Sequence, residues 1–261
     1  MKLSALVVAH NEEQRLAACL ERLRFADEIV VVLDKCTDGS KEIAGRFTDR
    51  LVEGSWELEG PRRNTGIEAC RGEWIVEIDA DEHVTPELGE ELRAMAEGSP
   101  FDYHLITVDN WVGAKLVRHG WGASFGKAAY IGLFRPAAKI WGHQRVHPQL
   151  TLRGRQGPTL THHMQHFVDR NFSDMIRRFD NYSTARAQDL VESGHIGSSF
   201  HNVRRIFSRF FRCYIRRGGW REGGHGFLIA VFAALYPLVS YLKAKYDFSP
   251  VSEDQKGGDG A

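Results

Sequence analysis

The sequence has few cysteines and no closely spaced pair of them. Its four cysteines, Cys19, Cys36, Cys70 and Cys213, are scattered through 261 residues without a Cys-x-x-Cys motif. Zinc ribbons and small disulfide-stabilised folds depend on closely spaced cysteines. Both classes are therefore excluded, and free thiols favour a reducing cytoplasm.

A net charge of either sign is also missing, because 34 lysines and arginines balance 34 acidic residues. The balance hides a division. Residues 1–100 carry 12 basic and 22 acidic residues, a net charge of −10, whereas residues 101–261 carry 22 and 12, a net charge of +10. The two halves predict surfaces with different partners, the second partner being anionic, and we expect no nucleic acid among them.

No apolar run is long enough for a perpendicular membrane span, which needs roughly 20 residues. Residues 227–242 are almost wholly apolar, but the run is shorter than that and Pro237 interrupts it. We expect a monotopic or re-entrant element. The N-terminal run at residues 3–9 is shorter still and lacks a small-residue cleavage site, so it predicts a strand and no signal peptide.

The first hundred residues show short apolar runs that alternate with helical patterns. Strands are expected at residues 3–9, 29–33, 50–53 and 73–79, and helices are expected between them. Such alternation predicts an α/β fold, with a mostly parallel sheet that helices cover on both faces. A further helix should begin at Thr85, because threonine followed by proline is a typical helix start.

Polar residues follow three of these predicted strands at their carboxyl ends. Asp79 and Asp81 follow the fourth strand, His10 and Glu12 follow the first, and Asp34 follows the second. An Asp-x-Asp motif alone occurs by chance in many soluble chains. Ligands of parallel sheets bind outside the strand carboxyl ends, so the three clusters together predict a site for a cation or a phosphate.

The last hundred residues have helical patterns instead. An amphipathic helix is expected from about residue 171 to 193, and a second one follows at 203–215. In the second helix, large apolar residues recur at i, i+3, i+4 and i+7 and arginines supply the charge between them. This pattern is typical of an interfacial helix on anionic lipid; the alternative is a helix docked on the catalytic domain with a basic outer face. We expect residues 249–261, with glycines and polar residues, to be disordered.

An ordered set of short motifs resembles the family 2 inverting glycosyltransferases of the GT-A fold, and among them the bacterial lipopolysaccharide-core β-glucosyltransferases. The motifs are Ala9-His10-Asn11-Glu12-Glu13, residues 26–34 with Thr37-Asp38, Pro61-Arg62-Arg63-Asn64, Asp79-Ala80-Asp81-Glu82, Arg118-His119-Gly120, Val146-His147-Pro148, and the arginine-rich helix with the turn Gly223-Gly224-His225-Gly226. The resemblance implies a catalytic domain at 1–165, with a nucleotide-sugar half (1–100) and an acceptor half (101–165). A membrane-associating helical region would occupy 166–248.

The resemblance also implies roles for individual residues. His10, Glu12 and Asp34 would line the nucleotide pocket, with Asp34 at the base. Arg63 and Asn64 would lie near the diphosphate or brace the pocket. Asp79 would face the ribose and the metal, and Asp81 would ligate Mg²⁺ or Mn²⁺, since both ions prefer oxygen ligands.

The catalytic base is where the sequence departs from the family. Relatives commonly have Val-His-Glu where this chain has Val146-His147-Pro148-Gln149, and glutamine cannot accept the acceptor's proton. His147 and Asp109 are the candidates for the base, although His147 can instead ligate the metal. His162, His163 and His166 are not assigned as a metal cluster, because no carboxylate motif accompanies them.

The sequence thus predicts a metal-dependent inverting hexosyltransferase. It would use a nucleotide sugar, UDP-hexose by expectation, and a lipid-linked or lipopolysaccharide-core acceptor at the inner face of the cytoplasmic membrane. The alternative is a catalytically degenerate glycosyltransferase fold that acts as a membrane-bound binding or scaffold protein. A sugar nucleotidyltransferase is poorly supported, because the glycine-rich N-terminal loop with an Arg-Lys pair is missing.

Overall fold

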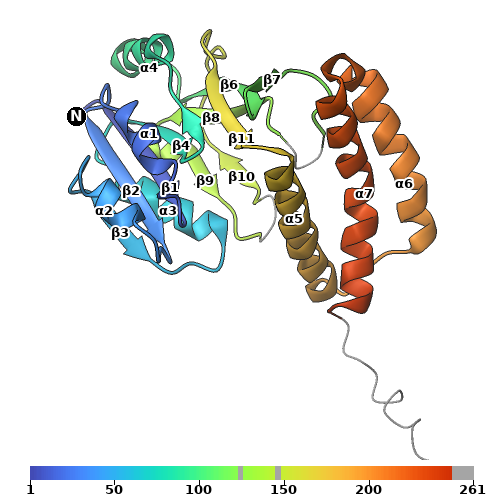
Figure 1. Ribbon diagram of the computed structural model, residues 1–261. Coiled ribbons are helices and arrows are strands. Elements are labelled where there is room, and N and C mark those ends of the chain that lie inside the picture. The colour runs from blue at the N-terminus through green and yellow to red at the C-terminus, as the bar shows by residue number, and fades with distance from the viewer. Residues whose placement is uncertain (123–125, 145–147, 249–261) are drawn as a thin grey trace, which may run out of the picture. The chain divides into compact units, whose positions relative to one another are not determined.

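The computed structural model describes residues 1–122, 126–144 and 148–248, and they form two compact units (Figure 1). Unit 1 contains Met1–Val117 and Lys127–Arg170. Unit 2 contains Arg118–Gly126 and the chain from Asn171 onward. The predicted tail at 249–261 lies outside the described residues.

A nine-stranded sheet is the centre of unit 1, in the order β3-β2-β1-β4-β8-β6-β11-β5, with β7 paired to β6. β1 pairs in parallel with β2 and β4, and β2 pairs in parallel with β3, whereas β8 is antiparallel to both of its neighbours. The predicted α/β fold is therefore confirmed, and its parallel part matches the first four predicted strands. The strands are β1 (Leu3–Ala9), β2 (Glu28–Asp34), β3 (Leu51–Gly54), β4 (Trp74–Asp79), β5 (Glu82–His83), β6 (Tyr103–Val112), β7 (Lys115–Val117), β8 (Ala129–Phe134) and β11 (Met164–Asp169). A separate two-stranded sheet pairs β9 (Lys139–Trp141) with β10 (Leu150–Leu152).

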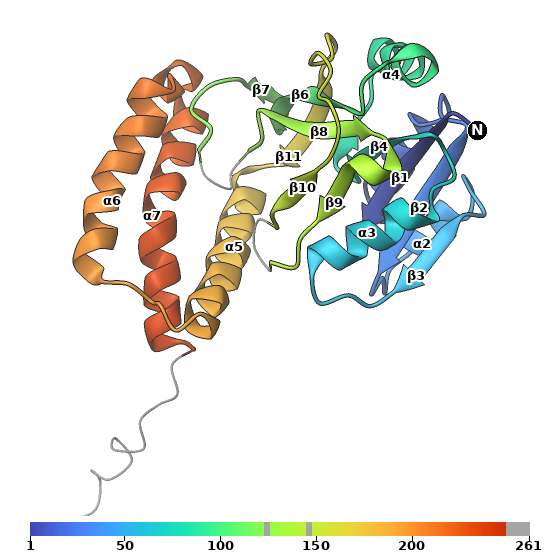
Figure 2. The ribbon, with the colours of Figure 1, turned by 180° about the vertical axis from the view of Figure 1, so that it is seen from behind.

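Apolar side chains cover both faces of the parallel strands. On one face, Leu3 and Val7 of β1 pack with buried residues of α1 (Leu16–Glu21), α2 (Ser40–Ala44) and α4 (Pro86–Gly98). On the other face, Leu6 of β1 packs with Ile67 of α3 (Glu59–Ala69), which Figure 2 shows in front. Successive side chains of a strand point to opposite faces, so runs without polar residues are what two covered faces require.

The sheet curls so that its last strand returns to its middle. Two residues, Ala80 and Asp81, separate β4 from β5, yet β5 pairs with β11 at the far end of the strand order. The Phe167 amide of β11 also donates a hydrogen bond to the Asp81 carbonyl at 2.9 Å. The curl therefore places β11 beside the Asp-x-Asp motif, although about 85 residues separate them in the sequence.

Unit 2 contains three long helices, and α7 lies between the other two (Figures 1 and 2). They are α5 (Phe172–Glu192), α6 (Ser199–Phe211) and α7 (Gly224–Tyr246). Helix α5 confirms the helix predicted at 171–193, and the Asn171 side chain accepts a hydrogen bond from the Asp174 amide at 2.9 Å as its N-cap. The second predicted helix corresponds to α6 and a π-helical turn at Arg212–Arg216.

Helix α7 is longer than the sequence indicated. The helix is 23 residues long and continues without a break through Pro237, so the predicted interruption at this proline is wrong. By length and composition alone, α7 is the one helix among the described residues that could cross a membrane, and half of its most apolar window is buried. The buried side chains include Ile229, Ala233 and Tyr236, as in a core helix that packs between two others.

Candidate active site

The carboxyl ends of β1, β2 and β4 bring the three predicted polar clusters to one edge of the sheet. β1 lies between β2 and β4, so the order of the strands reverses between β1 and β4. A crevice outside the carboxyl ends forms at such a reversal and is where ligands bind in α/β folds. His10 follows β1 and Asp34 and Asp79 end β2 and β4, so the topology brings together the residues that the sequence singled out.

Asp34 is held by two donors. Its carboxylate accepts hydrogen bonds from the Arg62 guanidinium at 2.9 Å and from the Trp56 amide at 3.0 Å. The Nδ1 atom of exposed His10 lies 2.6 Å from the Asp34 carbonyl oxygen. Lys35, the next residue, adopts a left-handed conformation with φ of 51°, which is unusual for a residue with a side chain. This turn ends β2 at the rim of the site.

Glu12 lies in the loop after β1, which is bound to the loop after β2. The Glu12 amide donates to the Ser40 hydroxyl at 2.9 Å, and the Asn11 side chain accepts from the Thr37 amide at 2.8 Å. Burial raises the pKa of the Glu12 carboxyl, and the nearby negative charge of Asp81 raises it further. Glu12 therefore belongs to the same electrostatic cluster as the Asp-x-Asp motif.

Asp79 lies between two cations. Its two carboxylate oxygens accept from Arg63 at 2.9 Å and from Lys127 at 3.0 Å, and Lys127 also contacts buried Glu82 at 2.6 Å. Burial would raise the pKa of Asp79, but the positive charges of Arg63 and Lys127 outweigh it and hold that pKa well below its usual range. Asp79 is therefore a fixed carboxylate with both oxygens occupied.

Arg63 and Asn64 lie on α3, and their side chains contact other groups of the protein. Besides Asp79, Arg63 donates to Glu59 at 2.8 Å and to Glu77 at 2.7 Å. The Asn64 side chain makes a pair of hydrogen bonds, each 2.9 Å long, with the backbone N–H and C=O of Trp141. Of the two implied positions for these residues, this geometry fits bracing of the pocket.

Asp81 lies in a different environment from Asp79. Its Oδ2 atom is 3.6 Å from the Arg15 guanidinium and 3.4 Å from Nε2 of His166 on β11. The other ring nitrogen of His166 lies 2.9 Å from the Asn110 side-chain oxygen. Burial lowers the pKa of His166, but the Asp81 carboxylate outweighs this and raises it overall. Asp81 and His166 thus form a partly exposed pair on the side of the sheet that carries the site.

Of the two predicted bases, the structure describes only Asp109, and Asp109 does not join this cluster. Asp109 precedes Asn110 on β6, so its side chain points to the opposite face of the strand, where it lies 3.2 Å from His163. The sheet therefore separates Asp109 from the Asp81 and His166 pair. His147 lies outside the described residues.

Sequence reasoning missed Arg15, Lys127 and His166. No motif marks Lys127 or Arg15. The three histidines near residue 164 offered a weak signal, but they diverge: His162 contacts Glu91 at 2.9 Å, His163 contacts Asp109, and only His166 faces the site. Successive side chains of a strand point to opposite faces, so a strand predicted at this position would have placed His163 and His166 on opposite faces of the sheet.

A divalent cation fits the donors beside Asp81. Within residues 1–122, 126–144 and 148–248, no three histidine, cysteine or acidic side chains form a ready metal cluster. Mg²⁺ needs fewer protein ligands than that, because it is commonly bound by one or two carboxylates together with substrate phosphates. Asp81 and His166 are close enough to share an ion, whereas both oxygens of Asp79 already accept from cations.

Comparison with known proteins gives matches over most of the chain. A family model described as Glycosyl transferase family 2 matches residues 4–135. The lipopolysaccharide core biosynthesis glycosyltransferase LpsC of Rhizobium meliloti is 27% identical over 256 residues, which cover 93% of this chain and 92% of LpsC. The uncharacterized glycosyltransferase YibD of Escherichia coli is 33% identical over 117 residues, 41% of this chain and 34% of YibD.

Similar folds are also found among solved structures. The crystal structure of S. aureus TarS 1-349 in complex with UDP-GlcNAc superposes with a TM-score of 0.50 at 16% identity, covering 94% of this chain and 88% of that chain. The complex of the same protein with UDP gives a TM-score of 0.50 at 17% identity, with the same coverage. At this identity the likeness concerns the fold.

Proposed function

The chain belongs to glycosyl transferase family 2, and from this membership we propose that it transfers a hexose from a nucleotide sugar, UDP-hexose, to a hydroxyl of a lipid-linked or lipopolysaccharide-core acceptor. The protein is a glycosyltransferase with the GT-A fold that the sequence motifs implied. The finer parts of the proposal are the donor, the acceptor, inversion of the anomeric carbon and the requirement for a divalent cation.

The observation that carries the proposal is the pair of differently bound aspartates at the end of β4. Asp79 is held ionised by Arg63 and Lys127, whereas the Oδ2 atom of Asp81 makes the contacts of this residue with both Arg15 and His166. We assign Asp81 and His166 as ligands of Mg²⁺ or Mn²⁺. Asp79 remains the predicted contact to the ribose and the metal. The side chains of Arg63 and Lys127 set the position of its carboxylate. A cation bound there would neutralise the charge of the departing nucleoside diphosphate.

The other residues supply binding and orientation. Asp34 would receive the base of the nucleotide, because Arg62 and the Trp56 amide fix its carboxylate at the rim of the crevice. His10 and Glu12 would complete the pocket from the neighbouring loop. His147 is retained as the proposed base that takes the acceptor proton during a single in-line displacement, and Asp109 is not, because it lies on the other face of β6.

Two observations support the proposed acceptor: the similarity to LpsC and the exposed apolar surface of unit 2. LpsC is named for lipopolysaccharide core biosynthesis and matches along almost the whole of both chains. A lipid-borne acceptor requires contact with a membrane, and α6 has an apolar stripe exposed to solvent. Phe200, Phe207 and Phe211 are 77%, 73% and 55% exposed, and they lie on one side of the helix.

Side chains on the other side of α6 and of the following π-helical turn pack inward, as buried Asn202 and Cys213 respectively show. Arginines border the exposed stripe, including Arg204 and Arg212. An apolar stripe flanked by cations suits the surface of an anionic membrane. We therefore propose that the enzyme is a peripheral or monotopic protein on the inner face of the cytoplasmic membrane.

A donor screen tests the proposed reaction. The purified chain is incubated with UDP-glucose, UDP-galactose and UDP-N-acetylglucosamine, with an anionic glycolipid extract and with or without Mn²⁺, and products are identified by mass spectrometry. We expect one donor to be consumed in the presence of the metal and a hexose to be added to a lipid. Tight binding of a donor without transfer or hydrolysis would favour the scaffold alternative instead.

The membrane contact is tested by Phe207→Asp. Burial of a phenylalanine contributes about 1.5–3 kcal/mol, so the substitution should weaken binding to vesicles that contain phosphatidylglycerol by about tenfold or more. Ser208→Asp is the matched control, because it adds the same charge to the neighbouring exposed position. Equal weakening by both variants in a co-sedimentation assay would show that charge alone drives the binding and would contradict insertion of the stripe.

A further inference from the structure

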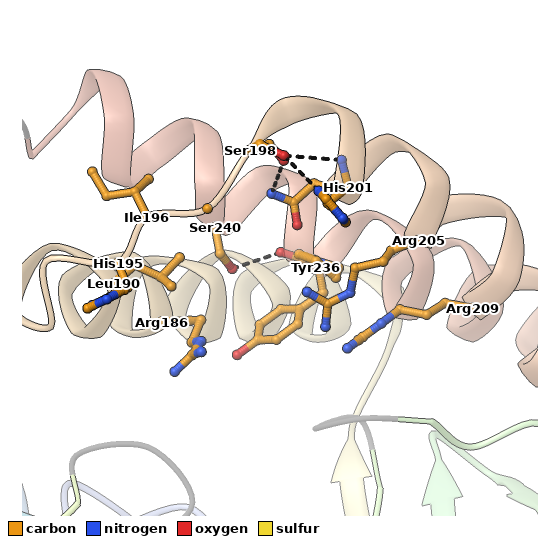
Figure 3. A pocket seen from close by; sticks show the side chains of 13 residues that line it. Arg186, Leu190, His195, Ile196, Ser198, His201, Arg205, Arg209, Tyr236 and Ser240 are labelled. Carbon is orange, nitrogen blue, oxygen red and sulfur yellow. Dashed lines mark hydrogen bonds between the residues drawn. The ribbon is translucent and has the colours of Figure 1, made fainter.

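Unit 2 contains a cavity of about 520 Å³ that is lined by residues of this unit. It is bounded by α5, α6, α7 and the connection between α5 and α6, and Figure 3 shows the side chains that line it. None of the motifs that define the proposed active site contributes to this lining. A volume of this size suits a small molecule or the head group of a larger one.

The lining of the cavity is strongly basic. Arg186 of α5 and Arg205 and Arg209 of α6 lie on either side of the Tyr236 ring, and His195 and His201 are also in the lining. None of the thirteen described residues that line the cavity is acidic. The cavity therefore collects positive charge without supplying a carboxylate to balance it.

The two arginines of α6 lack a counter-charge within the described part of the chain. Arg186 lies 3.6 Å from Asp189, but no acidic group lies within 4.0 Å of Arg205 or Arg209 in residues 1–122, 126–144 and 148–248. Burial lowers the pKa of half-buried Arg209, and the positive charge of Arg205 lowers it further. Like charges four residues apart on a helix destabilise it, so an anion between the two arginines would remove a cost of folding.

The remaining walls indicate what accompanies the anion. The Ser198 hydroxyl caps α6 and lies 3.0 Å from Nδ1 of His201, so polar groups border the cationic side. Leu190, Ile196 and Pro237 add apolar surface to the lining. A bare inorganic ion would use only the cationic side, whereas a phosphate attached to a larger group would also contact this apolar surface.

We propose that this cavity binds the phosphate of a membrane lipid head group, with Arg205 and Arg209 as its principal ligands. Arginine guanidinium groups bind phosphate oxygens through charge-assisted hydrogen bonds, which are among the strongest in proteins. The choice of a lipid over a free phosphate follows from α6 itself. The helix that carries both arginines also carries the exposed stripe of Phe200 and Phe207 on its opposite face, so binding of the stripe to a membrane would hold the cavity one helix diameter, roughly 10 Å, from the lipid head groups. This choice of source rests on the proposed membrane association.

The test uses the full chain and a soluble phospholipid. Dihexanoyl phosphatidic acid below its critical micelle concentration is titrated into the protein by calorimetry, with inorganic phosphate and dihexanoyl phosphatidylcholine in parallel. We expect phosphatidic acid to bind at least tenfold more tightly than either comparison. Equal binding of inorganic phosphate would identify a free anion as the ligand and overturn the lipid assignment. Absence of binding would overturn the site.

Matched variants separate the cavity from general basic charge. Arg205→Ala with Arg209→Ala should weaken phosphatidic acid binding by about tenfold or more, since each arginine supplies a charge-assisted contact. Arg216→Ala with Arg221→Ala removes the same charge from exposed positions that do not line the cavity and should leave the affinity unchanged. Equal losses in the two pairs would show a non-specific basic surface and contradict the proposal.

A third variant tests the shape of the site. Ile196→Trp keeps every charge and fills part of the volume, so it should also weaken binding of the soluble lipid, and unchanged affinity would count against the cavity. Phe207→Asp should weaken vesicle binding and leave soluble lipid binding intact. Failure of the donor screen while this pattern persists would contradict the proposed reaction and leave the lipid site standing.

Discussion

Asp81→Asn is expected to lower the rate of hexose transfer by about 100- to 1,000-fold, in line with the loss of one group that stabilises charge in a transition state. The substitution keeps the size of the side chain but removes the negative charge that lies 3.4 Å from His166 and 3.6 Å from Arg15. Asparagine is a weaker ligand for Mg²⁺ or Mn²⁺ than a carboxylate is. The measurement is kcat and KM for the donor found by the screen, at several metal concentrations.

A second measurement supports the same assignment. Removal of divalent metal with EDTA should abolish wild-type turnover, and added Mn²⁺ or Mg²⁺ should restore it. The variant should require more metal for half-maximal rate. Glu90→Gln, an equivalent neutralisation on the exposed surface of α4, is the control and should behave as the wild type. A fully active Asp81→Asn enzyme in the absence of metal would sink the assignment of Asp81.

Glu77→Ala is expected to have the largest effect on stability, a loss of about 3–5 kcal/mol in the free energy of unfolding. Glu77 accepts from Arg63 at 2.7 Å and from Lys139 at 2.6 Å, and the Lys139 side chain is 1% exposed. Removal of the carboxylate would leave buried cations without a counter-charge, whereas Glu77→Gln keeps an acceptor and should lose less. Urea unfolding followed by tryptophan fluorescence measures the difference, and Glu73→Ala, which breaks only an exposed ion pair with Lys2, should change little.

The same network gives a dependence on pH with a definite sign. Burial would raise the pKa of Glu77, but the Lys139 and Arg63 charges outweigh it and lower the pKa below the ordinary value of 4.5. A carboxyl whose pKa is lower in the folded state stabilises that state above its unfolded pKa and loses this contribution as the pH falls through the folded value. The stability difference between wild type and Glu77→Ala should therefore be full near neutral pH and shrink below pH 4.5.

Much of the local structure followed from the sequence because its causes are local. Residues 3–9 are a strand in the structure as predicted, since seven apolar or small side chains in succession suit a strand buried on both faces. Thr85 caps α4 by accepting a hydrogen bond from the Leu88 amide at 3.3 Å, as the Thr-Pro pair indicated. Pro237 is the exception, because packing on both sides of α7 maintains a helix that the proline alone disfavours.

Neighbouring residues on β6 show where sequence reasoning stops. Asp109 and Asn110 are both polar, and the sequence favoured the carboxylate as a candidate base. Alternation along a strand guarantees that only one of the two can face the site, but the choice depends on how β6 pairs with β11. The structure places Asn110 there, in contact with His166, and places Asp109 on the other face with His163.

The sequence by itself determined the α/β alternation, the polar clusters at three strand ends and the amphipathic helices of unit 2, because each depends on periodicity or on neighbours within a few residues. Only the tertiary structure decided that Lys127 and Arg63 occupy both oxygens of Asp79, and that His166 lies beside Asp81. These contacts join residues separated by up to about 85 positions, and the contact of His166 with Asp81 exists because the sheet curls to bring β11 beside β5, which follows β4. Periodicity records which face of an element is buried, whereas the partners across a site are set by how the elements pack.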